Sequence, residues 1–235
     1  MLSIVCFKWK PKGAYRSIFG AQTVNILKRM VDRHYANPHR VICVTDDARD
    51  IDPDIEIMPL WDDHANVPSP HGAGNPSCYR RLKAYSKEAS DWFGPRFVIL
   101  DLDCVIVRDM VPVWDTPADF CIWGDTNPMS PYNGSMQLMN TGARSQVWET
   151  FDPVESPKRS KAMGYFGSDQ GWIAACLGPN ENRWSTVNGV YSYRNHIARA
   201  AGKLPPNARI VFFHGQTDPW HPQAQALDWV KEHYR

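Results

Sequence analysis

Two aspartates follow a strongly apolar segment near the middle of the chain. The sequence there is Phe97-Val-Ile-Leu-Asp101-Leu102-Asp103. In open α/β sheets, ligands bind outside the carboxyl ends of strands, and a buried strand over residues 96–100 would end at Asp101. Side chains two residues apart in extended backbone point the same way, so both carboxylates are expected to face one hard cation, which prefers oxygen ligands. We therefore expect Asp101 and Asp103 to bind a divalent metal.

The same acidic pair admits two other interpretations. It matches the Asp-x-Asp-x-[Thr/Val] pattern of haloacid dehalogenase-type phosphatases, in which Asp101 would be the nucleophile. That motif normally lies near the N-terminus of its family, whereas about a hundred residues of α/β pattern precede it in this chain. The pair could also be two solvated or capping aspartates at a strand end. The apolar residues on both sides favour a functional site over that last alternative.

A histidine ends a second apolar segment, near the end of the sequence. Residues 209–213 predict a strand, and His214 and Gly215 follow it directly. A histidine at a strand end is usually structural, but paired with the acidic motif its imidazole could complete the coordination of the same metal. Gly215 would let the backbone approach a phosphate group closely, because glycine carries no side chain. We therefore expect His214 to be the third metal ligand and Gly215 to contact the bound ligand.

The elements that must position these residues alternate between short apolar segments and longer helical patterns. Strands are predicted over residues 2–7, 40–44, 55–58, 96–100, 105–108, 119–123, 135–139 and 209–213. Helices are predicted over residues 20–35, 78–92, 144–151, 168–177 and 222–233, the first with Val24, Leu27, Met30 and Val31 on one face. This alternation predicts an α/β fold with a mixed, mainly parallel central sheet. Its 235 residues show no repeat or linker, which predicts a single domain.

Charge and composition argue against several classes of protein. The formal net charge is +1 and no basic stripe is visible, so we expect no nucleic-acid partner. We find no apolar run long enough for a transmembrane segment, and the apolar residues 1–7 lack the features of a signal peptide, so a cytoplasmic location is the expectation. The six cysteines form no CxxC pair, which predicts neither a disulfide framework nor a zinc site.

Taken in order, these motifs resemble those of GT-A-fold glycosyltransferases, and most closely family 8, the group of glycogenin and bacterial galactosyltransferases. The Asp101-Leu102-Asp103 segment resembles that family's metal-binding Asp-x-Asp, and residues 214–220 (His-Gly-Gln-Thr-Asp-Pro-Trp) resemble its His-x-x-Gly-x-x-Lys-Pro-Trp ending. One spacing is shorter, and Asp218 stands where the family has a lysine that helps to hold the donor diphosphate. The resemblance implies a GT-A-type, Rossmann-like fold with a nucleotide-binding half (1–103) and a sugar and acceptor half (104–235).

Three further segments resemble the same family. Residues 132–140 are similar to its Phe-Asn-x-Gly-hydrophobic stretch, which implies that Asn133 contacts the donor sugar. Residues 168–173 are similar to its Asp-Gln helix start, which implies that Asp169 binds the sugar and Gln170 lies near the anomeric carbon. Residues 79–82 are similar to its aromatic-x-Lys-Leu segment, which implies that Arg81 touches the diphosphate. On the residues alone, Asn133 could instead be a turn residue and Asp169 a helix cap.

The first predicted strand is expected to end near the nucleotide's base and ribose. Phe7 and Lys8 lie at that strand end, and Leu102 lies inside the acidic motif, so all three are candidate contacts to the nucleotide-sugar. Tyr15 could stack on the base, although an ordinary packing role is equally compatible with its position.

The implied activity is transfer of a hexose from a nucleotide-sugar, a UDP-sugar by expectation, to a hydroxyl acceptor. Mn²⁺ or Mg²⁺ held by Asp101, Asp103 and His214 would act as a Lewis acid on the departing nucleotide. The resemblance implies retention at the anomeric carbon, whereas an inverting enzyme would need a carboxylate base such as Asp169 or Asp125. The acceptor stays open among glycans, lipid-linked glycans, proteins and small molecules. A non-catalytic nucleotide-sugar-binding module is a further alternative.

Overall fold

The structure is a computed structural model, and it describes residues 1–10, 18–70, 78–124, 127 and 129–235. Its main element is a seven-stranded sheet in the order β3-β2-β1-β4-β7-β6-β8. The strands are β1 (Leu2–Lys8), β2 (His39–Thr45), β3 (Glu56–Pro59), β4 (Arg96–Leu100), β6 (Phe120–Trp123), β7 (Asn133–Asn140) and β8 (Arg183–Trp184). Neighbouring strands are parallel except where β7 pairs with β4 and β6. The predicted α/β fold with a mixed, mainly parallel sheet is confirmed.

Both faces of this sheet are covered, because alternate side chains of β1 enter two different hydrophobic cores. Leu2, Ile4 and Cys6 belong to one core, and Val5 and Phe7 belong to the other. Complete burial of each aliphatic side chain is worth about 1.5–3 kcal/mol. The continuous apolar pattern of β1 therefore reflects a strand that lies between two layers.

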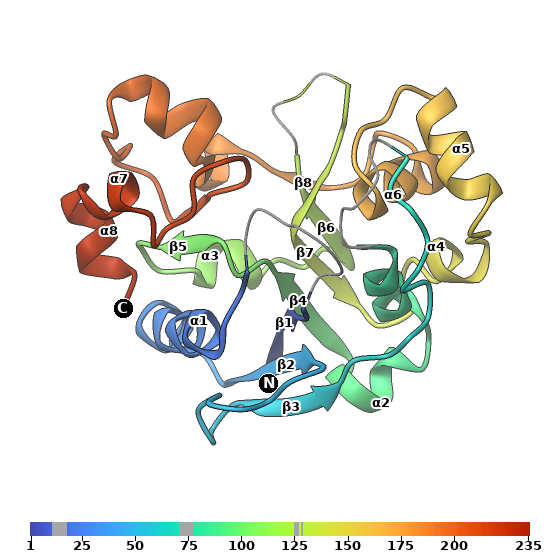
Figure 1. The fold of residues 1–235 in the computed structure, drawn as a ribbon, viewed down its shortest axis with the longest axis horizontal. Helices are drawn as coiled ribbons and strands as arrows, with labels where there is room; N and C mark the ends of the chain where they lie inside the picture. The colour runs from blue at the N-terminus through green and yellow to red at the C-terminus, as the bar shows by residue number, and fades with distance from the viewer. Residues whose placement is uncertain (11–17, 71–77, 125–126, 128) are drawn as a thin grey trace.

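The layers come from different parts of the chain (Figure 1). The first core contains α1 (Ala21–His34), whose predicted apolar face is buried as expected. The second core contains residues of the 3₁₀ helix η1 (Cys78–Tyr85), α2 (Ala89–Phe93), α4 (Gln146–Glu149) and α6 (Asp169–Leu177). The remaining helices are α3 (Val111–Trp114), α5 (Glu155–Ala162), η2 (Thr186–Asn188), η3 (Tyr193–Ile197), η4 (Ala198–Ala200), α7 (Pro222–Gln225) and α8 (Asp228–His233).

A second, three-stranded sheet lies beside α1 and contributes to the first core. Its order is β5-β10-β9, with β5 (Cys104–Ile106) antiparallel to β10 (Ile210–Phe212) and β9 (Val190–Ser192) parallel to β10. The sequence predicts β5 and β10 separately but neither their pairing nor β9. We call this element the small sheet.

Two predicted helices are interrupted in the structure. The segment 78–92 divides into η1 and α2, and the segment 222–233 divides into α7 and α8. Leu227 between the latter two is extended, with φ −85° and ψ 127°. Its side chain packs closely against Gly202, so a tertiary contact accompanies the break. The helix α5 is missed by the sequence pattern because its residues (ESPKRSKA) carry almost no apolar periodicity. None of the described helices has the length and apolar character that crossing a bilayer requires.

Candidate active site at one sheet edge

The acidic pair lies at the carboxyl end of β4, as predicted. The Asp101 amide donates to the carbonyl of Ser135 (2.9 Å), which ties this strand end to β7. The backbone bends at Leu102 and Asp103, so the extended geometry expected across the pair is wrong. The Asp101 side chain is 28% exposed, whereas Asp103 is buried. Leu102 is buried in the first core, which leaves its backbone as the part that a ligand can reach.

Arg81 joins the acidic pair to the predicted sugar-binding helix. Its guanidinium donates through Nη1 to Asp101 Oδ1 (2.5 Å), and through Nε (2.9 Å) and Nη2 (2.5 Å) to Asp169 Oδ2. Arg81 is only 8% exposed. Burial alone would lower the pKa of Arg81, but the carboxylates of Asp169 and Asp101 raise it well above its ordinary value. The three residues therefore form a largely buried, charged cluster with one net negative charge.

Asp169 opens α6, but its carboxylate is committed to Arg81 rather than to the helix end. Ser168 is the N-cap residue and makes no side-chain capping bond. Asp169 Oδ2 instead receives both bonds from the guanidinium. This geometry disfavours the interpretation of Asp169 as a simple helix cap, because its position is set by a distant cation in η1.

Gly134 lets Arg81 and the start of α6 approach β7. A Cβ on Gly134 would lie 2.9 Å from Arg81 Nη2 and 3.5 Å from Asp169 Oδ2. The Gly134 amide donates to Gln170 Oε1 (3.2 Å), so Gln170 is held at the same point. The structure thus brings together four residues that the sequence predicts from separate segments: Arg81, Asp101, Asp169 and Gln170.

Buried polar residues of β7 form hydrogen bonds next to this cluster. Asn133 is buried, and its Oδ1 accepts from the Ser135 amide (2.9 Å), so it belongs to a strand rather than to a free turn. Gln137 donates to the Gly134 carbonyl (2.9 Å) and accepts from the Tyr85 hydroxyl (2.5 Å). The sequence analysis misses Gln137 and Tyr85. A lone glutamine inside the apolar run 135–139 is the signal that could have identified the first of them.

His214 and Gly215 follow β10 at the corresponding end of the small sheet. The Phe213 amide donates to the Asp103 carbonyl (2.7 Å), so this segment lies beside the acidic pair. The His214 ring packs edge-on against Trp123 at 5.4 Å. Gly215 has φ +125°, a conformation that residues with side chains rarely adopt. Asp218 is fully buried, with His221 Nε2 3.4 Å from its carboxylate.

The three predicted metal ligands share one edge without forming a ready-made metal site. Over the residues that the structure describes, no group of three or more His, Cys, Asp or Glu side chains is arranged to hold an ion. The Asp101 carboxylate is instead bound by Arg81. Coordination by Asp101, Asp103 and His214 therefore stays a prediction, in which Asp101 would either offer the ion its second oxygen or give up its bond to Arg81.

The end of β1 is more tightly packed than the sequence suggests. The Lys8 ammonium donates to the Asp47 carbonyl (2.5 Å) and the Thr45 hydroxyl (3.3 Å), so it closes the end of β2. Phe7 is buried beside Trp61, with ring centroids 5.7 Å apart. Their nucleotide contacts stay predictions, and Tyr15 lies outside the described residues.

No family model and no curated protein matches this sequence, but solved structures match nearly all of it. The galactosyltransferase LgtC, in complex with donor and acceptor sugar analogs, has a TM-score of 0.64 at 16% identity, over 98% of this chain and 94% of LgtC. The glycosyltransferase GlyE of Streptococcus pneumoniae has a TM-score of 0.57 at 12% identity, over 99% and 63%. Mouse xyloside xylosyltransferase 1 has a TM-score of 0.56 at 12% identity, over 92% and 98%. The chain has the GT-A fold. At these identities the likeness establishes the fold alone.

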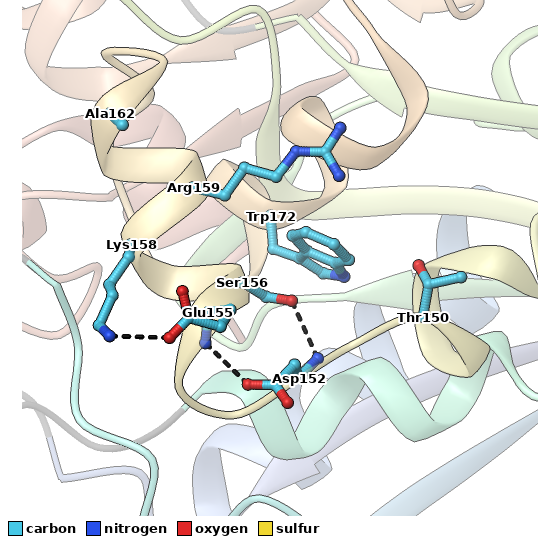
Figure 2. Close-up of a pocket in the computed structure, with 8 residues that line it drawn as sticks. All are labelled: Thr150, Asp152, Glu155, Ser156, Lys158, Arg159, Ala162 and Trp172. Atoms are coloured by element: carbon cyan, nitrogen blue, oxygen red, sulfur yellow. Dashed lines mark hydrogen bonds and ion pairs between the residues drawn. The ribbon is translucent and has the colours of Figure 1, made fainter.

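A cavity away from this site lies beside α5, and several of its polar groups are bonded to each other. It has a volume of about 500 Å³ and is lined by α5, the segment that precedes α5, and Trp172 of α6 (Figure 2). Lys158 pairs with Glu155 (2.8 Å), and Asp152 accepts from the Val154 and Glu155 amides at the start of α5. Because these contacts stabilise the helix end, we assign this cavity no role in binding the donor.

Proposed function

We propose that this GT-A chain is a glycosyltransferase that moves a hexose from a UDP-sugar to a hydroxyl acceptor. The observation that carries the proposal is the cluster of Arg81, Asp101 and Asp169, held by bonds of 2.5–2.9 Å. It links the acidic pair, where the diphosphate is predicted, to the start of α6, where the sugar is predicted. The likeness to LgtC, whose structure holds donor and acceptor sugar analogs, supports the same assignment.

The ligand atoms that the predicted metal-binding side chains would offer are of the kinds that Mn²⁺ or Mg²⁺ binds. Asp101 and Asp103 would supply carboxylate oxygens and His214 an imidazole nitrogen, which are ligands that such ions accept. When bound, the ion would supply Lewis-acid stabilisation of the leaving diphosphate.

The remaining steps belong to the chain's own side chains. Arg81 would release Asp101 to the metal and keep its bonds to Asp169, which leaves Nη1 to donate to a phosphate oxygen as charge develops there. Asp169 would accept from sugar hydroxyls, and Asn133 would contact the same sugar. Gln170, held by the Gly134 amide, would face the anomeric carbon. Phe7, Lys8 and Tyr15 would border the base and ribose.

Retention at the anomeric carbon is part of this proposal. An inverting enzyme needs a carboxylate that takes a proton from the acceptor hydroxyl. Asp169 is a poor choice, because its Oδ2 already accepts two bonds from Arg81. Asp125, the other sequence candidate, lies outside the described residues. The resemblance to family 8 supports retention independently.

The two alternative functions are not favoured. An aspartyl nucleophile of a phosphatase would have to attack with Asp101, whose Oδ1 is bound by Arg81, and the matching structures are glycosyltransferases. A non-catalytic binding module would keep the same contacts to the nucleotide-sugar. Only a measurement of turnover can therefore distinguish it from an enzyme.

The direct test is incubation with a panel of UDP-hexoses, Mn²⁺ and mixed hydroxyl acceptors, with release of UDP as the readout. We expect metal-dependent hydrolysis or transfer with at least one donor, and the anomeric configuration of the product can be read by NMR. Metal-assisted UDP binding without turnover would support the binding module instead. If UDP does not bind at all, the proposed function is wrong.

A further inference from the structure

The small sheet brings an arginine to the same edge as the acidic pair. In the register of β10 with β5, Phe212 lies opposite Cys104, so the residues after β10 run beside the acidic pair. In the parallel register of β10 with β9, Phe212 lies opposite Ser192, the last residue of β9, and Arg194 follows two residues later in η3. Neighbouring strands lie about 4.8 Å apart, so Ser192, at the end of β9, lies about 10 Å from Cys104, the residue that follows the acidic pair.

The Arg194 side chain lies across the backbone of Gly215. A Cβ on Gly215 would be 3.2 Å from Arg194 Cδ and 3.8 Å from both Nε and Nη1. The absence of a side chain at Gly215 therefore makes room for the arginine stem next to His214. Tyr193 stacks on Phe213 with ring centroids 4.4 Å apart, which fixes the backbone from which Arg194 projects.

Arg194 has a charge that the protein does not neutralise. It is exposed, and within the described ranges no carboxylate lies at ion-pair distance from it; its one recorded side-chain hydrogen bond is a 3.4 Å contact to Asn195. The other basic side chains predicted at the site are occupied. Arg81 is bound by two carboxylates, and Lys8 donates to Thr45 and Asp47.

The segment 215–221, which follows His214, contains no lysine or arginine. Asp218, the residue at the implied lysine position, is a buried acid beside His221. Among the residues that the structure describes, Arg194 in η3 is therefore a cation beside His214 and Gly215 whose charge is left available to an anion at this edge. Arginine suits that task, because its planar guanidinium can donate two parallel bonds to a phosphate.

We propose that Arg194 binds the diphosphate of the nucleotide-sugar from the small-sheet side of the edge. This inference rests on the proposed function, since it assumes a diphosphate beside Asp101 and Asp103. Arg194 is a binding residue in this account, and it would hold the diphosphate before and after the sugar leaves.

The test compares binding of UDP and uridine to the full chain in the presence of Mn²⁺, by calorimetry. Arg194→Gln should weaken UDP binding by about tenfold, the lower limit for one bond to a charged group. Uridine, which lacks phosphates, should bind the variant as it binds the wild type. Arg194→Lys should recover part of the loss. Arg199→Gln, which alters another exposed arginine five residues further on, is the matched control and should change nothing.

Equal UDP affinity in wild type and Arg194→Gln would overturn the inference. So would a parallel loss of uridine affinity, which would indicate general damage to the site, or an equal loss in Arg199→Gln. Wild-type protein that binds no UDP would instead contradict the proposed function itself, so the two failures are distinguishable.

Discussion

Two arginines flank the same edge, and their surroundings are opposite. Arg81, on the side of the central sheet, is buried and bonded to two carboxylates. Arg194, on the side of the small sheet, is exposed and lies over a glycine. The first has its charge balanced by the protein, and the second does not.

This difference separates two tasks that positive charge performs in one site. A buried cation between carboxylates fixes geometry, since removing it leaves unpaired charges in a region with little water. An exposed cation contributes little to stability but remains available to an incoming anion. We therefore expect Arg81 to organise the site and Arg194 to recruit ligand, and the two roles predict different losses on mutation.

The largest effect is expected from Arg81→Ala. The variant leaves Asp101 and Asp169 close together without their shared cation, so the free energy of unfolding should fall by about 3–5 kcal/mol. Arg194→Ala should change it by less than about 0.5 kcal/mol, as expected of a surface position. Urea denaturation followed by tryptophan fluorescence measures both. Similar losses in the two variants would remove the distinction between the arginines.

Asp101→Asn should separate activity from stability. Loss of a predicted metal ligand should lower the rate of UDP-sugar turnover by about 100-fold or more, in the range measured for loss of one charge-stabilising group. Stability should fall less than in Arg81→Ala, because Arg81 keeps both bonds to Asp169 and the Asp101 side chain is 28% exposed. Asp91→Asn, at an exposed aspartate, is the control. If Asp101→Asn turns over UDP-sugar at the wild-type rate, the assignment of Asp101 as a metal ligand is wrong.

A methyl group at Gly134 should disturb the cluster without removing any charge. The new Cβ would lie 2.9 Å from Arg81 Nη2, and overpacking of this kind costs about 1–3 kcal/mol. Gly20→Ala is the control, since a Cβ there meets nothing within 4 Å. Thermal unfolding should show a lower midpoint for Gly134→Ala alone. An unchanged midpoint would mean that the guanidinium can move aside easily.

The last prediction concerns His34, a half-buried base far from the site. Burial, and then His233 and Arg33, lower the pKa of His34 from 6.5 to about 4. Between these two pH values the unfolded chain binds more protons than the folded chain, so the free energy of unfolding falls as the pH decreases from 6.5 to 4. His34→Gln should make this fall shallower while leaving the value at pH 8 almost unchanged. An equally steep fall in the variant would show that His34 does not contribute.

The sequence predicts the central sheet well because strands that are buried on both faces consist largely of apolar residues. Leu2–Lys8 and Arg96–Leu100 are mostly apolar, and the apolar residues of α1 recur at helical spacing. It also predicts Arg81, Asp101, Asp169 and Gln170 as site residues, although from a family resemblance. Their meeting depends on contacts between residues 20 to 88 positions apart, which no local pattern encodes.

The small sheet and Arg194 escape sequence analysis for a related reason. β9 has only three residues, and 17 residues separate it from its partner β10. Neither composition nor spacing therefore predicts that the two strands pair. The sequence does not predict the bend at Leu102 and Asp103, because the two short strands on either side suggest one extended segment. Each of these features is decided by tertiary packing rather than by local propensity.

The most direct test of the account is a crystal structure of the wild-type protein with UDP and Mn²⁺, using anomalous scattering to locate the metal. We predict one manganese ion within about 2.0–2.2 Å of Asp101, Asp103 and His214, with oxygen and nitrogen ligands at the distances usual for divalent ions. Arg81 should keep Asp169 and release Asp101, and Arg194 should reach the diphosphate from the small sheet. UDP bound elsewhere, or bound here with the Arg81–Asp101 pair intact and no metal between the two sheets, would contradict it.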